Sequence, residues 1–139
     1  MKKIILISLI FLALFACKKT KFEPEGPTDI RIRNLSDQDF TEVIVKTSEK
    51  NEDVDTLGII NANSTSDYFR FTKAYTKAEI SAKIDIDGIV STYSTGSVDF
   101  TYLNYIGQDR ITFEVWISKP TEKELAIFNV IIEEPLVLK

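Results

Sequence analysis

The sequence contains no histidine and a single cysteine in its 139 residues, and both scarcities exclude whole classes of chemistry. Without histidine, the Ser-His-Asp and Cys-His catalytic arrangements are excluded. A zinc site is disfavoured because cysteine and histidine are the usual zinc ligands. The 5 glycines do not form a phosphate-binding loop. The sequence therefore predicts a protein that is not an enzyme and that carries no cofactor and no metal.

Positive charge is also scarce, which argues against nucleic acid as a partner. The chain has 17 lysines and arginines against 21 aspartates and glutamates, a net charge of −4. Two of the lysines, Lys2 and Lys3, lie in an N-terminal segment that we expect to be removed, so the mature chain is more negative still. An acidic surface gains nothing from neutralising phosphates, the main source of affinity for nucleic acids.

The first seventeen residues are organised as a secretion signal. Two lysines precede residues 4–16, in which only Ser8 is polar. This run is shorter than the roughly 20 apolar residues that a membrane-spanning helix needs. It ends in Leu14-Phe15-Ala16-Cys17, which resembles the lipobox of bacterial lipoproteins. The resemblance implies a lipid on the thiol of Cys17, cleavage before that residue and attachment to a membrane through the lipid.

An uncleaved anchor, or a buried strand with a chance cysteine, is the alternative interpretation of this segment. The lipoprotein interpretation is favoured because the only cysteine of the chain stands at the one position where the lipobox needs it. Residues 1–16 are then the signal peptide, and residues 17–28 are the lipidated cysteine and a polar tether that contains two prolines. A tether of this kind spans up to about 30 Å.

Alternation of apolar and polar residues predicts an all-β domain over residues 29–139. The clearest strand covers residues 77–86, and Asp87-Gly88 after it is a strong hairpin signal because both positions tolerate a positive φ. A helix over residues 121–129 is the alternative to a last strand at 124–133, but the β-branched residues there favour the strand. Apolar residues at nearly every position of that strand predict that it is covered on both faces. The predicted strands are 29–33, 40–45, 54–60, 66–72, 77–86, 89–95, 111–117 and 124–133. Seven or eight short, mostly antiparallel strands predict a single β-sandwich, Ig-like or similar.

Three aromatic residues are the candidate ligand-binding residues. Tyr102 and Tyr105 lie in a long segment between predicted strands, and Trp116 lies on the polar face of its strand. Exposed aromatic rings stack on sugars and anchor protein interfaces. The alternative is that these rings cover the edge of the core.

Acidic residues offer weaker candidates. Asp85-Ile86-Asp87-Gly88 resembles the start of a calcium loop, and residues 51–55 are rich in carboxylates, but a hairpin and a solvated turn explain both segments. Paired carboxylates for glycoside hydrolysis would have to come from Asp99, Glu114, Glu133 and Glu134, and their spacing does not place any two of them together.

The mature domain resembles the small β-sandwich lipoproteins of Bacteroidota. The features that carry the resemblance are the lipobox at Cys17, the proline-containing tether, the first strand Ile30-Arg31-Ile32-Arg33-Asn34 and the hairpin Ile84-Asp85-Ile86-Asp87-Gly88. Members displayed on the cell surface usually have an acidic stretch after the cysteine, whereas this chain has Lys18-Lys19-Thr20-Lys21. The resemblance therefore implies the outer membrane, with the domain on the periplasmic face.

These observations predict a lipid-anchored, non-catalytic binding or scaffolding protein of the cell envelope. Its partner would be an envelope protein or a glycan. The alternative is a glycan-binding surface accessory lipoprotein that uses Tyr102, Tyr105 and Trp116.

Overall fold

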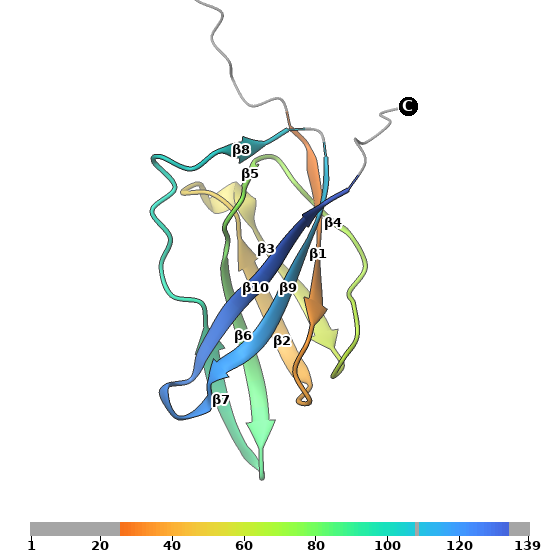
Figure 1. The fold of residues 1–139 in the computed structure, drawn as a ribbon, viewed down its shortest axis with the longest axis vertical. Coiled ribbons are helices and arrows are strands. Elements are labelled where there is room, and N and C mark those ends of the chain that lie inside the picture. Colours follow the sequence, from red (N-terminus) through yellow and green to blue (C-terminus); the bar gives the residue numbers. More distant parts are fainter. Residues whose placement is uncertain (1–25, 108, 134–139) are drawn as a thin grey trace, which may run out of the picture.

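The computed structural model describes residues 26–107 and 109–133, apart from the side chain of Glu52 (Figure 1). The predicted signal peptide, Cys17 and most of the tether lie outside the described residues. The elements run in the order β1 (Thr28–Asn34), β2 (Phe40–Lys46), η1 (Asn51–Asp53), β3 (Val54–Ile60), β4 (Phe69–Phe71), β5 (Ala74–Tyr75), β6 (Glu79–Ile86), β7 (Ile89–Ser94), β8 (Tyr105–Ile106), β9 (Arg110–Lys119), η2 (Pro120–Glu122) and β10 (Glu124–Ile132). The 3₁₀ helices η1 and η2 are one turn each, and no described segment forms a helix with the length and apolarity to cross a membrane.

Eight strands form one mixed sheet in the order β3-β2-β6-β7-β10-β9-β1-β4. The sheet curls until its edge strands β3 and β4 touch, so that it is nearly closed into a barrel. The all-β prediction is confirmed, but the two-sheet, Ig-like β-sandwich is wrong. The reason is a single parallel rung between Ser94 of β7 and Glu124 of β10, which joins strands that a sandwich would leave in separate sheets. The short pair β5-β8 lies apart from the main sheet, near the start of β1.

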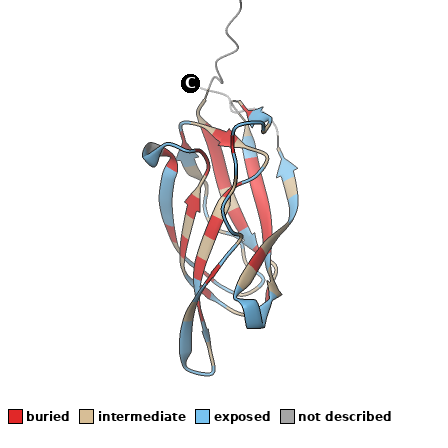
Figure 2. Ribbon diagram, turned by 90° about the vertical axis from the view of Figure 1, so that its left-hand side faces the viewer, coloured by how far each residue is buried: buried red, intermediate tan, exposed pale blue. Residues whose placement is uncertain are grey.

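The core fills the inside of the curled sheet, where the buried faces of the strands meet (Figure 2). On β6, Ile80, Ala82 and Ile84 are buried, as their alternation in the sequence predicts. Burying an isoleucine side chain stabilises the fold by about 1.5–3 kcal/mol. The largest fully buried side chains are Phe40, Phe71, Phe113, Ile30, Ile32, Ile60, Ile80, Ile84, Ile111, Leu125, Val43 and Val45.

The hairpin predicted at Asp87-Gly88 is confirmed. Asp87 has φ 54° and Gly88 has φ 81°, so both central residues of the β6-β7 turn are in the left-handed region. The backbone N–H of Gly88 donates a hydrogen bond to Oδ1 of Asp85 at 2.8 Å. The carboxylate of Asp85 therefore stabilises the turn. Among the described residues, no group of three or more His, Cys, Asp or Glu side chains is arranged to hold a metal ion.

Strand β10 is a strand as predicted, but the expectation that it is covered on both faces is wrong. Phe128 is 69% exposed and Ile132 is 54% exposed, and only Leu125 is buried. The register with β9 shifts between Ile127 and Asn129, which is a β-bulge that turns Phe128 out of the core. On its other side, β10 pairs with β7 only at Glu124, so no neighbouring strand covers most of it.

Candidate functional site

Three turns gather at the end of the molecule opposite the entry of the N-terminal segment (Figure 1). They are the β1-β2 turn, the β6-β7 hairpin and the β9-β10 turn, and we call this the distal end. Strand β1 runs from Thr28, beside the entry point, to Asn34 at the distal end. Its seven residues span about 20 Å.

A groove with a volume of about 470 Å³ opens at the distal end, and we call it the distal groove. Its apolar lining consists of Leu35, Ile86, Trp116, Ile117 and Pro120. Its polar lining comes mainly from the β1-β2 turn and consists of Ser36, Asp37, Gln38 and Asn63. Hollows with an apolar lining and a few polar groups are typical of binding sites.

An exposed aromatic pair extends the distal groove across the outer face of the sheet. The rings of Trp116 on β9 and Phe128 on β10 lie 6.3 Å apart in an edge-to-face arrangement of 71°. Trp116 is 44% exposed, and Phe128 is more exposed still. Tryptophan and other aromatic residues are enriched at the energetic centres of protein interfaces. This surface is the strongest candidate binding surface of the described residues.

Buried hydrogen bonds of Asn34 hold the β1-β2 wall of the distal groove. Its side-chain Nδ2 donates to the backbone oxygens of Gln38 at 2.8 Å, Asn61 at 3.2 Å and Ile60 at 3.3 Å. Its Oδ1 accepts from the backbone N–H of Ser36 at 2.9 Å and from the hydroxyl of Ser36 at 2.6 Å. Asn34 is fully buried, and it ties the end of β1 both to the turn and to the end of β3.

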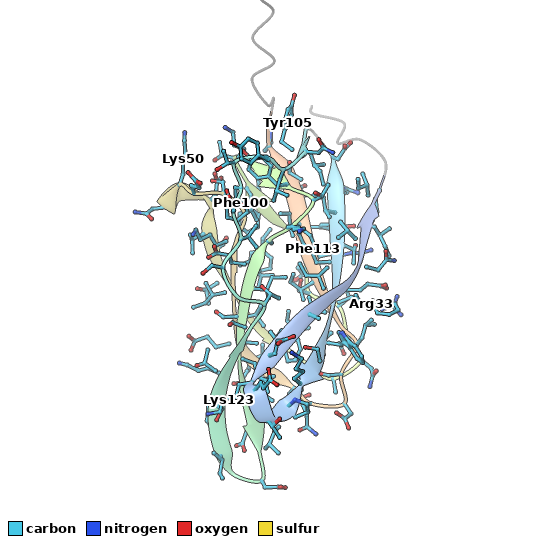
Figure 3. All side chains as sticks on the ribbon, turned by 60° about the vertical axis from the view of Figure 1, so that its left-hand side comes forward. Arg33, Lys50, Phe100, Tyr105, Phe113 and Lys123 are labelled. Carbon is cyan, nitrogen blue, oxygen red and sulfur yellow. The ribbon has the colours of Figure 1, made fainter. Side chains whose placement is uncertain are left out.

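The three predicted aromatic residues do not come together. Tyr102 is 92% exposed in the β7-β8 connection, and Tyr105 pairs with Tyr75 in the β5-β8 ladder. Figure 3 shows Tyr105 at the opposite end of the molecule from Lys123, which belongs to the β9-β10 turn. Trp116 lines the distal groove together with Pro120 of that turn. A single aromatic platform made of all three rings is therefore not formed, and a binding role for any one of them stays a prediction.

Sequence reasoning missed two apolar members of this surface. Phe128 lies in an unbroken apolar run, which predicts burial, and the bulge that exposes it leaves no obvious signal in the sequence. Leu35 lies between the predicted strands 29–33 and 40–45, and its backbone N–H donates to the carbonyl of Val115 at 2.8 Å, which places it beside Trp116. The proximity of these side chains depends on the parallel pairing of β1 with β9.

The carboxylates considered for hydrolysis take part in structural interactions. Glu114 forms an ion pair with Arg33 at 3.0 Å, and Glu133 forms one with Arg31 at 2.9 Å. Asp99 accepts a hydrogen bond from the backbone N–H of Thr101 at 3.0 Å. None of these three lines the distal groove, and Glu134 lies outside the described residues.

The acidic segment 51–55 also has a structural role. Asp53 is fully buried, where its carboxylate accepts hydrogen bonds from the hydroxyl of Ser48 and from the backbone N–H of Lys73. Asp55 is exposed and accepts a hydrogen bond from the backbone N–H of Thr56. The two carboxylates therefore point to different partners, and the calcium interpretation has no support here.

Glu133 is the centre of a polar network on the outer face of β1 and β9. Its carboxylate accepts hydrogen bonds from the hydroxyls of Thr112 and Tyr68, each at 2.6 Å. The guanidinium of Arg31 lies 4.7 Å from the centre of the Tyr68 ring. The hydroxyls of Thr112 and Tyr68, followed by the charge of Arg31, hold the pKa of Glu133 below its usual range, although partial burial opposes them. Burial and the hydrogen bond to Glu133 raise the pKa of Tyr68.

We expect this network to make the protein sensitive to acid. A glutamate in an unfolded chain has a pKa of about 4.3. Because the folded pKa of Glu133 is lower, its contribution to stability is present above that pH and is lost as the pH falls through the folded pKa. Glu133→Gln should lower the free energy of unfolding at neutral pH by about 1 kcal/mol, and its deficit relative to wild type should shrink in acid.

Urea unfolding between about pH 3 and pH 7 measures this effect. Asp87→Asn is the matched control, since Asp87 is exposed and forms no hydrogen bond or ion pair in the described part of the chain. A constant deficit of Glu133→Gln across the whole pH range would contradict the assignment.

Comparisons with known proteins define the class of fold. No protein-family model matches the chain, and a search of curated proteins finds no match. A solved structure, the NMR structure of the protein from Eubacterium rectale, resembles this one with a TM-score of 0.51 at 13% sequence identity. The match covers 74% of this chain and 89% of that chain. At this identity the likeness shows the fold alone, so this chain is structurally similar to that bacterial protein.

Proposed function

We propose that this chain is a lipid-anchored protein of the cell envelope that binds another protein through the distal groove and does no catalysis. The observation that carries the proposal is the Trp116-Phe128 pair, which stays exposed beside an apolar groove. Exposed apolar surface of this kind costs solubility and usually marks an interaction site.

The position of the groove supports a tethered mode of action. The described chain begins at Gly26, close to the start of β1, and the distal groove lies at the other end of that strand. A lipid on Cys17 would hold the N-terminal end at the membrane and present the groove away from it. Tethering raises the local concentration of the groove for a partner in the same compartment. The lysines at positions 18, 19 and 21 support the periplasmic face of the outer membrane.

Glycan capture receives less support from the geometry. The glycan-binding hypothesis requires Tyr102, Tyr105 and Trp116 to act together. Trp116 lies far from the β5-β8 end of the molecule, which holds Tyr105. The acidic residues around the groove also suit a protein partner better than a neutral sugar, because their charge adds selectivity to an apolar contact.

Site-specific photocrosslinking in intact cells tests the proposal. Benzoylphenylalanine introduced at Phe128 keeps an aromatic side chain at an exposed position, and the same group at Tyr102 is the matched control. We expect a protein adduct of defined mass from position 128 and none from position 102. Trp116→Ala in the same background should reduce the adduct strongly, since loss of a central aromatic residue costs about 2 kcal/mol or more in binding. Equal crosslinking from both positions, or none from either, would contradict the proposal.

A further inference from the structure

We propose that the distal groove selects a polypeptide segment in which apolar anchor residues are flanked by lysine or arginine. This inference rests on the proposed function, since it names the chemical class of the partner for the same surface. It is carried by the charges that surround the apolar lining.

Four carboxylates at the distal end either line the distal groove or belong to residues next to a lining residue in the chain, and none of them has a cation among the described residues to neutralise it. Asp37 lines the groove itself, and Asp39 follows Gln38 of the lining. Asp85 and Asp87 flank Ile86, which is also a lining residue. Within residues 26–107 and 109–133, none of the four forms an ion pair with a lysine or arginine. We call these four residues the acidic rim.

The basic residues at this end do not balance the acidic rim. Lys119 lies between two carboxylates, 3.3 Å from Glu122 and 3.1 Å from Glu124. Hydrogen bonds to Glu124 and Glu122 raise the pKa of Lys119, which keeps its charge engaged within the β9-β10 turn. Lys123 is the remaining cation of that turn, and its single positive charge compares with four carboxylates that form no ion pair in the described residues. The formal charges around the groove therefore sum to a negative value.

This combination of an apolar centre and a negative rim selects among possible occupants. An anionic membrane surface would meet the acidic rim with repulsion. A second copy of the chain, docked groove to groove, would bring two acidic rims together and meet the same repulsion. A segment with apolar residues between basic ones satisfies both features, because its apolar side chains cover Trp116 and Leu35 while its cations face the rim.

Trp116 provides a direct measurement, because it is the only tryptophan of the chain and lines the groove. The full-length protein in a non-ionic detergent is titrated with a peptide that has a Leu-Phe-Leu centre flanked on each side by two lysines. A second peptide carries two glutamates on each side of the same centre. We expect the lysine peptide to shift the emission of Trp116 and to bind roughly tenfold more tightly than the glutamate peptide.

Two double variants distinguish the effect of the acidic rim on peptide affinity from the effect of net charge. Asp37→Asn with Asp87→Asn removes two rim charges that make no hydrogen bond in the described residues, and should weaken the lysine peptide by roughly fivefold. Glu49→Gln with Asp55→Asn removes two charges near η1, at the other end of the molecule, and should leave the affinity unchanged. The selectivity should also fall when the salt concentration is raised.

Equal affinity for the two peptides, or equal loss in both double variants, would overturn the proposal. A doubled-mass adduct in the crosslinking experiment would overturn it as well, because the occupant would then be a second copy. The two proposals fail separately: an adduct with another protein at position 128 without a preference for the lysine peptide would leave the binding function intact and refute only the chemistry of the partner.

Discussion

Replacing Cys17 with alanine is expected to abolish incorporation of labelled palmitate into the protein. Cys17 is the only cysteine, so no other thiol can receive the diacylglyceryl group, and the amine acylated after cleavage is never released. The lipidated cysteine carries the two or three acyl chains that attach a lipoprotein to its membrane, so the substitution should remove the palmitate label completely. Metabolic labelling followed by gel analysis measures it directly, and the retained signal peptide appears as a larger mass.

Thr20→Ala is the matched control, because it alters the same segment while leaving residues 14–17 intact. Labelled palmitate should be incorporated into this variant as into wild type. Palmitate on the Cys17→Ala protein, or a wild-type protein that is never labelled, would refute the lipoprotein assignment.

The second large effect is expected for Asn34→Asp, which should destabilise the fold by about 3 kcal/mol at neutral pH. The Nδ2 of Asn34 donates to the backbone oxygens of Gln38, Ile60 and Asn61, and the substitution turns this donor into an acceptor. A carboxylate in that place would face three carbonyl oxygens in a fully buried position. Protonation removes its charge, so the deficit relative to wild type should become smaller as the pH falls. This direction follows because a carboxyl group whose folded pKa is raised destabilises the protein at high pH.

Asn63→Asp is the control for this substitution. Asn63 is also an asparagine in a turn, but it is exposed and has a φ of 55°, a conformation that aspartate tolerates well. The free energy of unfolding of the Asn63→Asp variant should stay within about 0.5 kcal/mol of wild type. Denaturant unfolding of both variants across pH decides the point, and similar small effects at positions 34 and 63 would show that the network of Asn34 contributes little.

The strands were predictable from the sequence because their signal is local. Period-two alternation identifies the buried face of β6, and Asp87-Gly88 identifies the turn after it, since both depend on neighbouring residues only. The closure of the sheet was not predictable in this way. A half-buried strand has the same alternation in a sandwich and in a curled single sheet, and the difference here is one rung between Ser94 and Glu124, which are thirty positions apart in the chain.

The candidate site was predictable only in part, for a related reason. Trp116 could be selected because it stands on the polar face of an alternating strand, and the structure places it on the distal groove. Tyr102 and Tyr105 were selected for their place in a long connection, which says nothing about which end of the molecule they occupy. Phe128 was not selected because a β-bulge reverses the face of the sheet on which one side chain lies. Bulges depend on pairing with the neighbouring strand.

The single rung between β7 and β10 also has a mechanical consequence. It divides the sheet into two four-stranded units, β3-β2-β6-β7 and β10-β9-β1-β4, which share a core but have only that ladder pair in common at this junction. On the opposite side, hydrogen bonds from Asn34 of β1 to the backbone oxygens of Ile60 and Asn61 join the two units at the end of β3. The distal groove takes Ile86 from one unit and Trp116 from the other, so its width depends on how the two units pack against each other.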